Sequence, residues 1–175
     1  MSITDPEQRV WLTEGGIELD AEQSPWHRRS TPNEEEIAMP ALDEAFDEFM
    51  KRRESVSLDY INGNSATLIG ISTAHDPATF FPPSGDLIEG AVAVNASNEK
   101  GAILFREGST GGFEVLQSWS EGNLGFWTGL QRAKIRMAGQ DREVPMSLRV
   151  TEVFRREEGE WKLVHRHADI LKSSP

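Results

Sequence analysis

The sequence predicts an α+β domain, with helices in its first half and an antiparallel sheet in its second. Three observations support this fold class. Residues 41–62 carry apolar side chains at helical spacing, residues 113–170 alternate apolar and polar positions, and the links between the alternating runs are short and polar. Alternation with short links is typical of sequential antiparallel strands. Helices followed by such a meander make an α+β arrangement.

The length of 175 residues predicts one domain with an appendage. We interpret residues 1–40 as a partly ordered N-terminal arm, residues 41–171 as the domain and residues 172–175 as a tail. The arm shows no sustained period, but it contains Trp11 and Trp26. A fully disordered segment rarely contains two tryptophans. We therefore expect them to dock onto the domain or onto a partner subunit.

Composition excludes several classes of function. The net charge of −11 argues against nucleic-acid binding, which needs clustered Lys and Arg. No stretch approaches the ~20 apolar residues of a membrane span, and no secretory leader begins the chain. The absence of cysteine excludes disulfides and thiolate chemistry. These features predict a cytoplasmic protein without a membrane partner, and no motif indicates a cofactor.

The clearest helix is predicted over residues 41–62. One stripe of its surface combines five hydrophobic side chains with one cation: Leu42, Phe46, Phe49, Arg53, Val56 and Tyr60. Arg53 has two interpretations, a side chain whose stem packs at the edge of the core or a cation that faces a pocket. Tyr60 is either a core ring with its hydroxyl at the boundary or a donor to a ligand. Asn62-Gly63-Asn64 ends the helix.

Short elements are predicted between this helix and the sheet. Asn64 can cap a second helix over residues 65–71. A Pro/Gly turn separates two short strands, at residues 79–81 and 86–89. Residues 91–105 predict a third helix, which is weakened by internal Asn and Gly.

Four strands complete the predicted domain. They span residues 113–120, 124–137, 142–155 and 160–170. The last two flank Glu157-Glu158-Gly159, a polar link with glycine where a positive φ is usually needed. Regular alternation would place His165, His167 and Asp169 on the same face as Trp161.

This histidine pair is the candidate catalytic site. His165 and His167 have the titration range that acid–base chemistry at neutral pH needs. The other interpretation is that both are hydrogen-bonded packing residues at the end of the sheet. A third interpretation is a zinc ion shared with Asp169, with His75 as a further ligand. We predict no metal.

Several segments resemble the NTF2-like superfamily, more narrowly its SnoaL-like branch and the association domain of calmodulin-dependent protein kinase II. They are Asn62-Gly63-Asn64, Phe80-Phe81-Pro82-Pro83-Ser84-Gly85 with Glu89-Gly90, Phe126-Trp127-Thr128-Gly129, and the run from Arg149 to His167 with its Gly-x-Trp-x-x-Val-His-x-His ending. The resemblance covers residues 41–171. It implies a cystatin-like cone, in which a strongly curved sheet wraps around the first helix and a pocket opens at the wide end. It also implies a homodimer through the outer face of the sheet.

The same resemblance implies several functions, since this scaffold hosts isomerases, cyclases, dehydratases and oligomerisation hubs. In the ketosteroid isomerases the base precedes a proline of the short hairpin, and Phe81 stands there in this chain. Phenylalanine cannot accept a proton. In the association domains a pocket arginine binds carboxylates, which directs attention to Arg149.

We therefore predict a small-molecule-binding protein whose ligand is apolar or carries a carboxylate. The predicted pocket residues are Tyr60, Phe81, Trp127, Arg149, Trp161 and Asp169. Enzymatic activity of the isomerase, cyclase or hydrolytic kind is left open. In an enzyme, His165 or His167 would be the general base, and Tyr60 or Arg149 would stabilise negative charge. The alternative is a non-catalytic association module.

Overall fold

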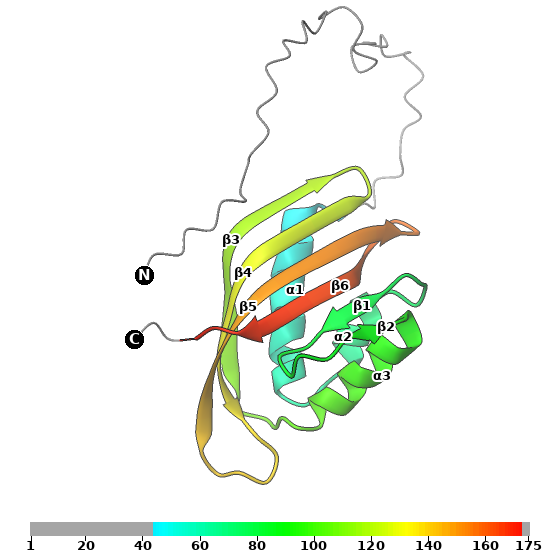
Figure 1. Cartoon of the computed structure of the whole chain (residues 1–175). Helices are drawn as coiled ribbons and strands as arrows, with labels where there is room; N and C mark the ends of the chain where they lie inside the picture. The colour runs from blue at the N-terminus through cyan, green and yellow to red at the C-terminus, as the bar shows by residue number, and fades with distance from the viewer. Residues whose placement is uncertain (1–43, 173–175) are drawn as a thin grey trace, which may run out of the picture. The chain divides into compact units, whose positions relative to one another are not determined.

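The computed structural model of this chain describes residues 44–172 (Figure 1). Its helices are α1 (Phe46–Ile61), α2 (Ala66–Ile71) and α3 (Ala91–Ala102). Its strands are β1 (Thr79–Phe81), β2 (Ile88–Glu89), β3 (Thr110–Glu121), β4 (Leu124–Arg136), β5 (Glu143–Glu157) and β6 (Glu160–Ile170). The predicted α+β order of elements is confirmed. The predicted arm, its two tryptophans and the tail from residue 173 lie outside the described residues.

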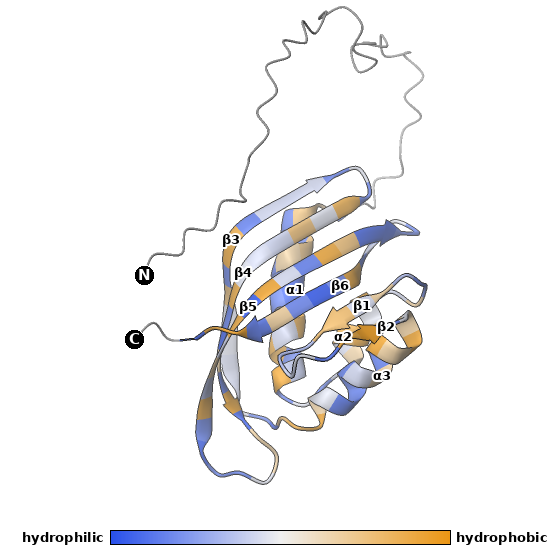
Figure 2. Ribbon diagram, in the orientation of Figure 1, coloured by the Kyte–Doolittle hydropathy of each residue, from blue (hydrophilic) through white to orange (hydrophobic). Residues whose placement is uncertain are grey.

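The long strands form a curved sheet around α1, as predicted (Figure 1). Within the described residues the strand order is β2-β1-β6-β5-β4-β3. Every second residue is buried along β4, and along β5 from Leu148 to Phe154. Figure 2 shows the alternation of apolar and polar residues along β5. The buried side chains meet the apolar stripe of α1, where the Phe49 and Phe154 ring centroids lie 4.9 Å apart.

Helix α1 uses the predicted stripe from Phe46 onward, and Leu42, the first predicted member, lies outside the described residues. Phe46, Phe49 and Val56 are buried in the core, and Arg53 is buried with them at 2% exposure. The helix begins at Phe46, later than predicted, and ends at Ile61. The N-cap residue of α2 is Ser65, one position after the predicted Asn64, whose Oδ1 accepts a hydrogen bond from the Ala66 backbone N–H at 3.0 Å.

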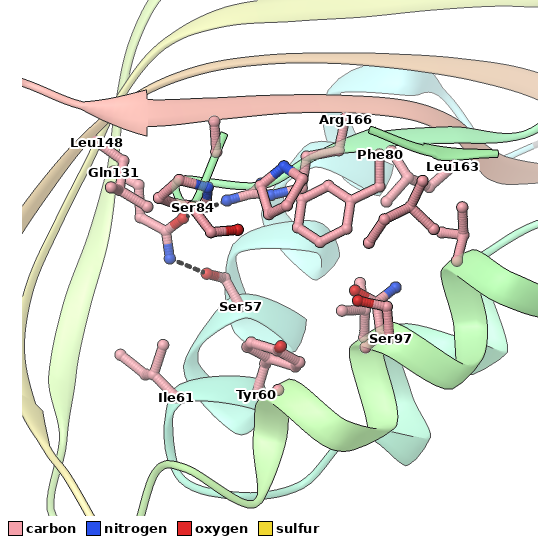
Figure 3. A pocket seen from close by; sticks show the side chains of 18 of the residues that line it. Ser57, Tyr60, Ile61, Phe80, Ser84, Ser97, Gln131, Leu148, Leu163 and Arg166 are labelled. Carbon is pink, nitrogen blue, oxygen red and sulfur yellow. Dashed lines mark hydrogen bonds between the residues drawn. The ribbon is translucent and has the colours of Figure 1, made fainter. Parts of the chain in front are cut away.

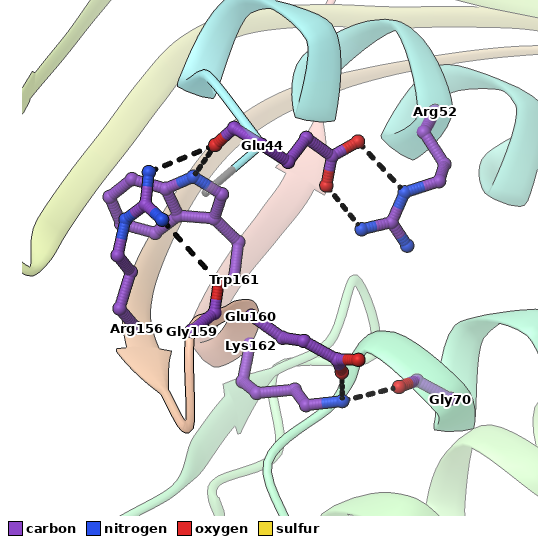
Figure 4. Close-up of polar contacts among 8 residues, drawn as sticks. All are labelled: Glu44, Arg52, Gly70, Arg156, Gly159, Glu160, Trp161 and Lys162. Carbon is purple, nitrogen blue, oxygen red and sulfur yellow. Dashed lines mark hydrogen bonds and ion pairs between the residues drawn. The ribbon is translucent and has the colours of Figure 1, made fainter. Parts of the chain in front are cut away.

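The β5–β6 hairpin has the predicted tight turn, with Gly159 at a φ of 86°. Its Trp161 is buried in the core and its indole Nε1 donates to the backbone carbonyl of Glu44 at 3.1 Å (Figure 4). Arg156 Nη2 donates to the same carbonyl at 2.9 Å, and its guanidinium lies 4.4 Å from the Trp161 ring centroid. The hairpin therefore anchors the chain just before α1. The single N–H donor of the Trp161 indole is used in this contact.

One feature of the sheet was not predicted. Strand β1 pairs with β6 in parallel, with Thr79 opposite His165 and Phe81 opposite His167. The sequence predicted only the pairing of β1 with β2, which the structure confirms. Because of this parallel pairing, the β1–β2 hairpin and the loop after β1 lie next to the C-terminal half of β6.

The predicted shared face of Trp161, His165 and His167 is wrong. The register of β6 against β5 shifts between Val153 and Phe154, so Val164 is an extra residue on β6. Such a β-bulge reverses which side chains point to each face. Beyond it, Arg166 and Ala168 lie opposite the inward-facing Glu152 and Val150. The outward-facing residues after the bulge are His165, His167 and Asp169.

No helix among residues 44–172 has the length and apolar character needed to cross a membrane.

Candidate functional site

A cavity of about 370 Å³ lies between the helices and the inner face of the sheet. Helices α1 and α3 form one side, β4, β5 and β6 form another, and the β1–β2 hairpin with its Pro82-Pro83-Ser84 loop closes the third (Figure 3). Most of the lining is apolar, including Ile61, Leu68, Phe80, Ile88, Val94, Leu104, Phe105, Met146, Leu148 and Leu163. A volume of this size accommodates a small organic molecule.

One polar part of the cavity wall belongs to a charged network whose centre, Glu152, lies behind the wall. Arg53 donates to this carboxylate twice, from Nε at 3.0 Å and from Nη2 at 2.6 Å. Trp127 Nε1 donates to Oε2 at 2.7 Å, and Arg166 Nη1 donates to Oε1. The side chains of Arg53, Glu152 and Arg166 are 3%, 0% and 14% exposed.

Each member comes from a different element. Arg53 comes from α1, Trp127 from β4, Glu152 from β5 and Arg166 from β6. The strand registers align the last three, because Glu152 lies opposite both Trp127 and Arg166. The bulge at Val164 is essential here, since it turns Arg166 inward.

The network holds Glu152 ionised. Burial opposes ionisation of this carboxyl, but the charges of Arg53 and Arg166 and the hydrogen bonds from Arg53 and Trp127 outweigh it, so its pKa is lowered. Burial lowers the pKa of Arg53, against the opposing attraction of Glu152. Arginine nevertheless keeps its proton in proteins. One buried and one partly buried cation therefore share one anion.

The hydrogen-bonding capacity of the cationic side is not fully used. Arg53 Nη1 is buried and has no hydrogen-bond partner among the described residues. Arg166 Nη2 donates to Gln131 Oε1 at 2.7 Å, and Gln131 Nε2 donates to the Ser57 hydroxyl at 2.9 Å (Figure 3). Arg53, Ser57, Gln131 and Arg166 all line the cavity. This wall can bind an anionic oxygen.

Carboxylates suited to act as a free base are scarce in the cavity wall. The only Asp or Glu among its lining residues is Asp86, which is exposed and accepts a hydrogen bond from the Ser84 hydroxyl at 2.7 Å. Glu152, behind the wall, is paired with two arginines. The arrangement is therefore better suited to binding an anion than to abstracting a proton.

Two of the predicted pocket residues, Tyr60 and Trp127, lie at or directly behind the cavity wall. Tyr60 lines it directly, and burial raises the pKa of its hydroxyl, against the charge of Arg166. Trp127 is fully buried behind the wall, where it holds Glu152. Trp161 belongs to the core and does not line the cavity.

The other predicted residues lie on the outer side of the sheet. The Phe81 ring contacts His165 and His167, with centroid distances of 5.1 and 5.6 Å. Thr79 Oγ1 and His165 Nδ1 lie 2.7 Å apart, and the pKa of His165 is lowered by burial and by the neighbouring His167. Neither histidine is among the cavity-lining residues.

Arg149 and Asp169 pair with each other. Arg149 Nε donates to Asp169 Oδ1 at 2.8 Å, and the two residues face each other across β5 and β6 on the outer side. The zinc interpretation finds no support in the described part of the chain, where no three His, Cys, Asp or Glu side chains converge on a common point.

Sequence reasoning missed Glu152, Gln131 and Arg166. A signal existed for Arg53, which interrupts the apolar stripe of α1, and for Glu152, which stands between Val150 and Phe154 on the buried face of its strand. Two opposite charges that interrupt two apolar faces indicate a buried pair. Arg166 gave no such signal, because its inward position depends on the bulge.

Comparisons with known proteins agree with this fold. Residues 114–171 match the family model described as the SnoaL-like domain. No protein with a curated description shows significant sequence similarity to the chain.

Three solved structures illustrate the similarity in fold. A candidate dehydratase of the NTF2-like family from Streptomyces avermitilis is 16% identical, with a TM-score of 0.61 and coverage of 73% of this chain and 97% of that one. An uncharacterized cystatin-like protein from Caulobacter vibrioides is 10% identical, with a TM-score of 0.56 and coverages of 73% and 89%. The CamKII hub homology domain of Chlamydomonas reinhardtii is 16% identical, with a TM-score of 0.56 and coverages of 74% and 100%. At these identities the likeness shows the fold alone. The chain thus carries a SnoaL-like segment on an NTF2-like, cystatin-like fold.

Proposed function

We propose that this protein binds a small, largely apolar molecule that carries a carboxylate. The observation that supports this most is the imbalance of charge in the cavity wall, where Arg53 and Arg166 share the single carboxylate of Glu152. A buried cation with an unused N–H is costly without an acceptor. A ligand carboxylate would supply that acceptor and balance the second charge.

The ligand's body would occupy the apolar remainder of the cavity. Phe80, Leu104 and Phe105 offer ring and alkyl surface there. Most of the binding free energy would come from burying this apolar part, and the arginines would fix its orientation. The proposal assigns proton transfer neither to His165 nor to His167, since both lie outside the cavity lining.

Replacing Arg166 by Gln should weaken the binding of a short arylalkyl carboxylate by about tenfold or more, because a charge-assisted hydrogen bond contributes roughly 1.5–3 kcal/mol. The measurement is isothermal titration calorimetry with 3-phenylpropanoate and its neutral amide. Arg149→Gln is the matched control, since Arg149 is an arginine on the neighbouring strand that pairs with Asp169 on the outer face.

Wild-type protein should prefer the carboxylate to the amide, and Arg149→Gln should keep that preference. The proposal fails if acid and amide bind wild type equally, or if the two arginine variants lose the same affinity. The same titrations with alkyl carboxylates of similar length and their amides show whether the preference for the charged group holds without the phenyl ring.

We also propose that the protein is a homodimer, formed through the outer face of the sheet. Trp119 and Leu124 are each 53% exposed on that side, and the Trp119 ring pairs with Phe126 at a centroid distance of 6.4 Å. Exposed aromatic side chains of this kind are typical of protein interfaces.

Light scattering should give the mass of a dimer for wild type and of a monomer for Trp119→Glu, because a buried charge without a partner disfavours association. Lys134→Glu, a charge change on the same strand pair away from these rings, should leave the dimer intact. A wild-type monomer contradicts the dimer. An assembly larger than a dimer favours the alternative function, a non-catalytic association module, which the structural likeness to the hub domain supports.

A further inference from the structure

The cavity has a second polar region, on its helical side. Tyr60 of α1 and Ser97 and Asn98 of α3 all line the cavity. Their hydroxyl and amide groups make no hydrogen bond to any other residue in the described range 44–172. Asn98 is only 5% exposed. Figure 3 shows Tyr60 and Ser97 on the helices, across the cavity from Gln131 and Arg166.

Buried amides are nearly always hydrogen-bonded, because leaving one unpaired costs the free energy of its desolvation. Asn98 offers two donors and one acceptor, and the Tyr60 phenol offers a donor and an acceptor. Apolar ligand surface against these groups would leave them unpaired. An oxygen atom of the ligand would satisfy them.

The close approach of the two helices keeps these groups together. A Cβ atom added to Gly101 would lie 2.2 Å from the Tyr60 hydroxyl oxygen, so the phenol lies directly against α3 at this glycine. Ser97 and Asn98 precede Gly101 by four and three residues, which places them on the same side of the helix. Glycine is thus required at position 101 for the Tyr60 hydroxyl to lie beside Ser97 and Asn98.

The two polar regions are separated along α1. Arg53 and Tyr60 are seven residues apart, which places their backbone positions roughly 10 Å apart along the helix axis. Both face the cavity, since a spacing of seven returns to the same side of a helix. One ligand can therefore contact both regions only if it carries polar groups at both ends.

We infer that the ligand is an oxygenated carboxylic acid, with its carboxylate at Arg53 and Arg166 and a remote hydroxyl or carbonyl oxygen at Tyr60 and Asn98. This inference rests on the proposed function, because it extends the same cavity. It narrows the ligand from any apolar acid to a hydroxy or keto acid with an apolar middle.

The test compares matched acids that differ only in the remote oxygen. The pairs are 6-oxoheptanoate with heptanoate and 3-(4-hydroxyphenyl)propanoate with 3-phenylpropanoate, titrated into wild type and Tyr60→Phe. Wild type should bind one or both oxygenated acids about fivefold or more tightly than the parent acids, as expected for one net hydrogen bond. Tyr60→Phe should lose most of this preference and bind the parent acids no more weakly.

Asn98→Leu and Gly101→Ala are second variants that reach the same group from α3. Asn98→Leu removes the amide, and Gly101→Ala forces the phenol to move. Each should reduce the preference for oxygenated acids while keeping the preference for carboxylates over amides. The melting temperature of each variant identifies any that fails to fold.

The outcomes separate the two proposals. If wild type binds both members of each pair equally and Tyr60→Phe changes neither, the inference is overturned, while a preserved preference for acids over amides leaves the proposed function standing. If wild type shows no preference for acids, the proposed function fails and this inference fails with it. If the preference for oxygenated acids survives all three variants, another part of the cavity recognises the oxygen and the assignment to Tyr60 and Asn98 is wrong.

Discussion

Replacing Glu152 by alanine should lower the free energy of unfolding by about 3–5 kcal/mol, the range expected when one partner of a buried ion pair is removed. The variant leaves the guanidinium groups of Arg53 and Arg166 in the interior without their carboxylate. It also leaves the Trp127 N–H without its acceptor. Urea unfolding followed by tryptophan fluorescence measures the loss.

Glu114→Ala is the matched control. Glu114 pairs with Arg132 at 3.0 Å on the same sheet, but both side chains are about half exposed, at 52% and 53%. Exposed pairs contribute roughly 0–1 kcal/mol. Equal losses in the two variants would contradict a special role for the buried network.

The same network predicts an acid dependence of stability. The folded-state pKa of Glu152 lies below its ordinary value of 4.5. Its contribution is therefore fully present above the unfolded-state pKa and is lost as pH falls through the folded-state value. Wild type should lose more stability than Glu152→Gln between neutral pH and the acid range. Parallel acid profiles for the two proteins would show that other carboxyls dominate.

Replacing Gly129 by alanine should destabilise the protein by about 3 kcal/mol or more, at the upper end of the range for overpacking. A Cβ atom here would lie 2.2 Å from the backbone oxygen of Glu114 and 3.0 Å from the backbone nitrogen of Leu116. Because backbone atoms cannot rotate away, the pairing of β3 with β4 must shift. Gly129 lies at the register shift between Val115 and Gln117, where β3 carries an extra residue.

Gly70→Ala is the control for this prediction. Gly70 lies in α2, and a Cβ atom there would have no neighbour within 4 Å. Alanine favours a helix over glycine by up to ~1 kcal/mol, so this variant should be neutral or slightly more stable. Thermal unfolding of both variants checks the contrast, and a stable Gly129→Ala protein would contradict the close approach.

The fold was largely predictable from local patterns. The stripe of α1 and the alternation of β4 and β5 each report which side chains are buried, and the short polar links report antiparallel order. The parallel pairing of β1 with β6 joins segments some 86 residues apart, as in the contact of Thr79 with His165, and no local pattern encodes it.

The candidate site was less predictable, for two physical reasons. A single extra residue at Val164 exchanges the faces of β6, so regular alternation placed His165 inside and Arg166 outside. The network also depends on a contact between Arg53 and Glu152, which are 99 residues apart. Each charge could be noticed in its own element, but only the folded chain brings them together.

A crystal structure of the protein with (4-bromophenyl)acetate tests the central claim most directly, because the anomalous signal of bromine fixes the ligand's orientation. The account predicts the carboxylate within hydrogen-bond distance of Arg53 Nη1 or Arg166, and the bromine in the apolar part of the cavity lined by Phe80 and Leu104. A carboxylate bound instead by Arg149, or by His165 and His167 on the outer face, would contradict it. So would a cavity without ligand at a concentration that saturates binding in solution.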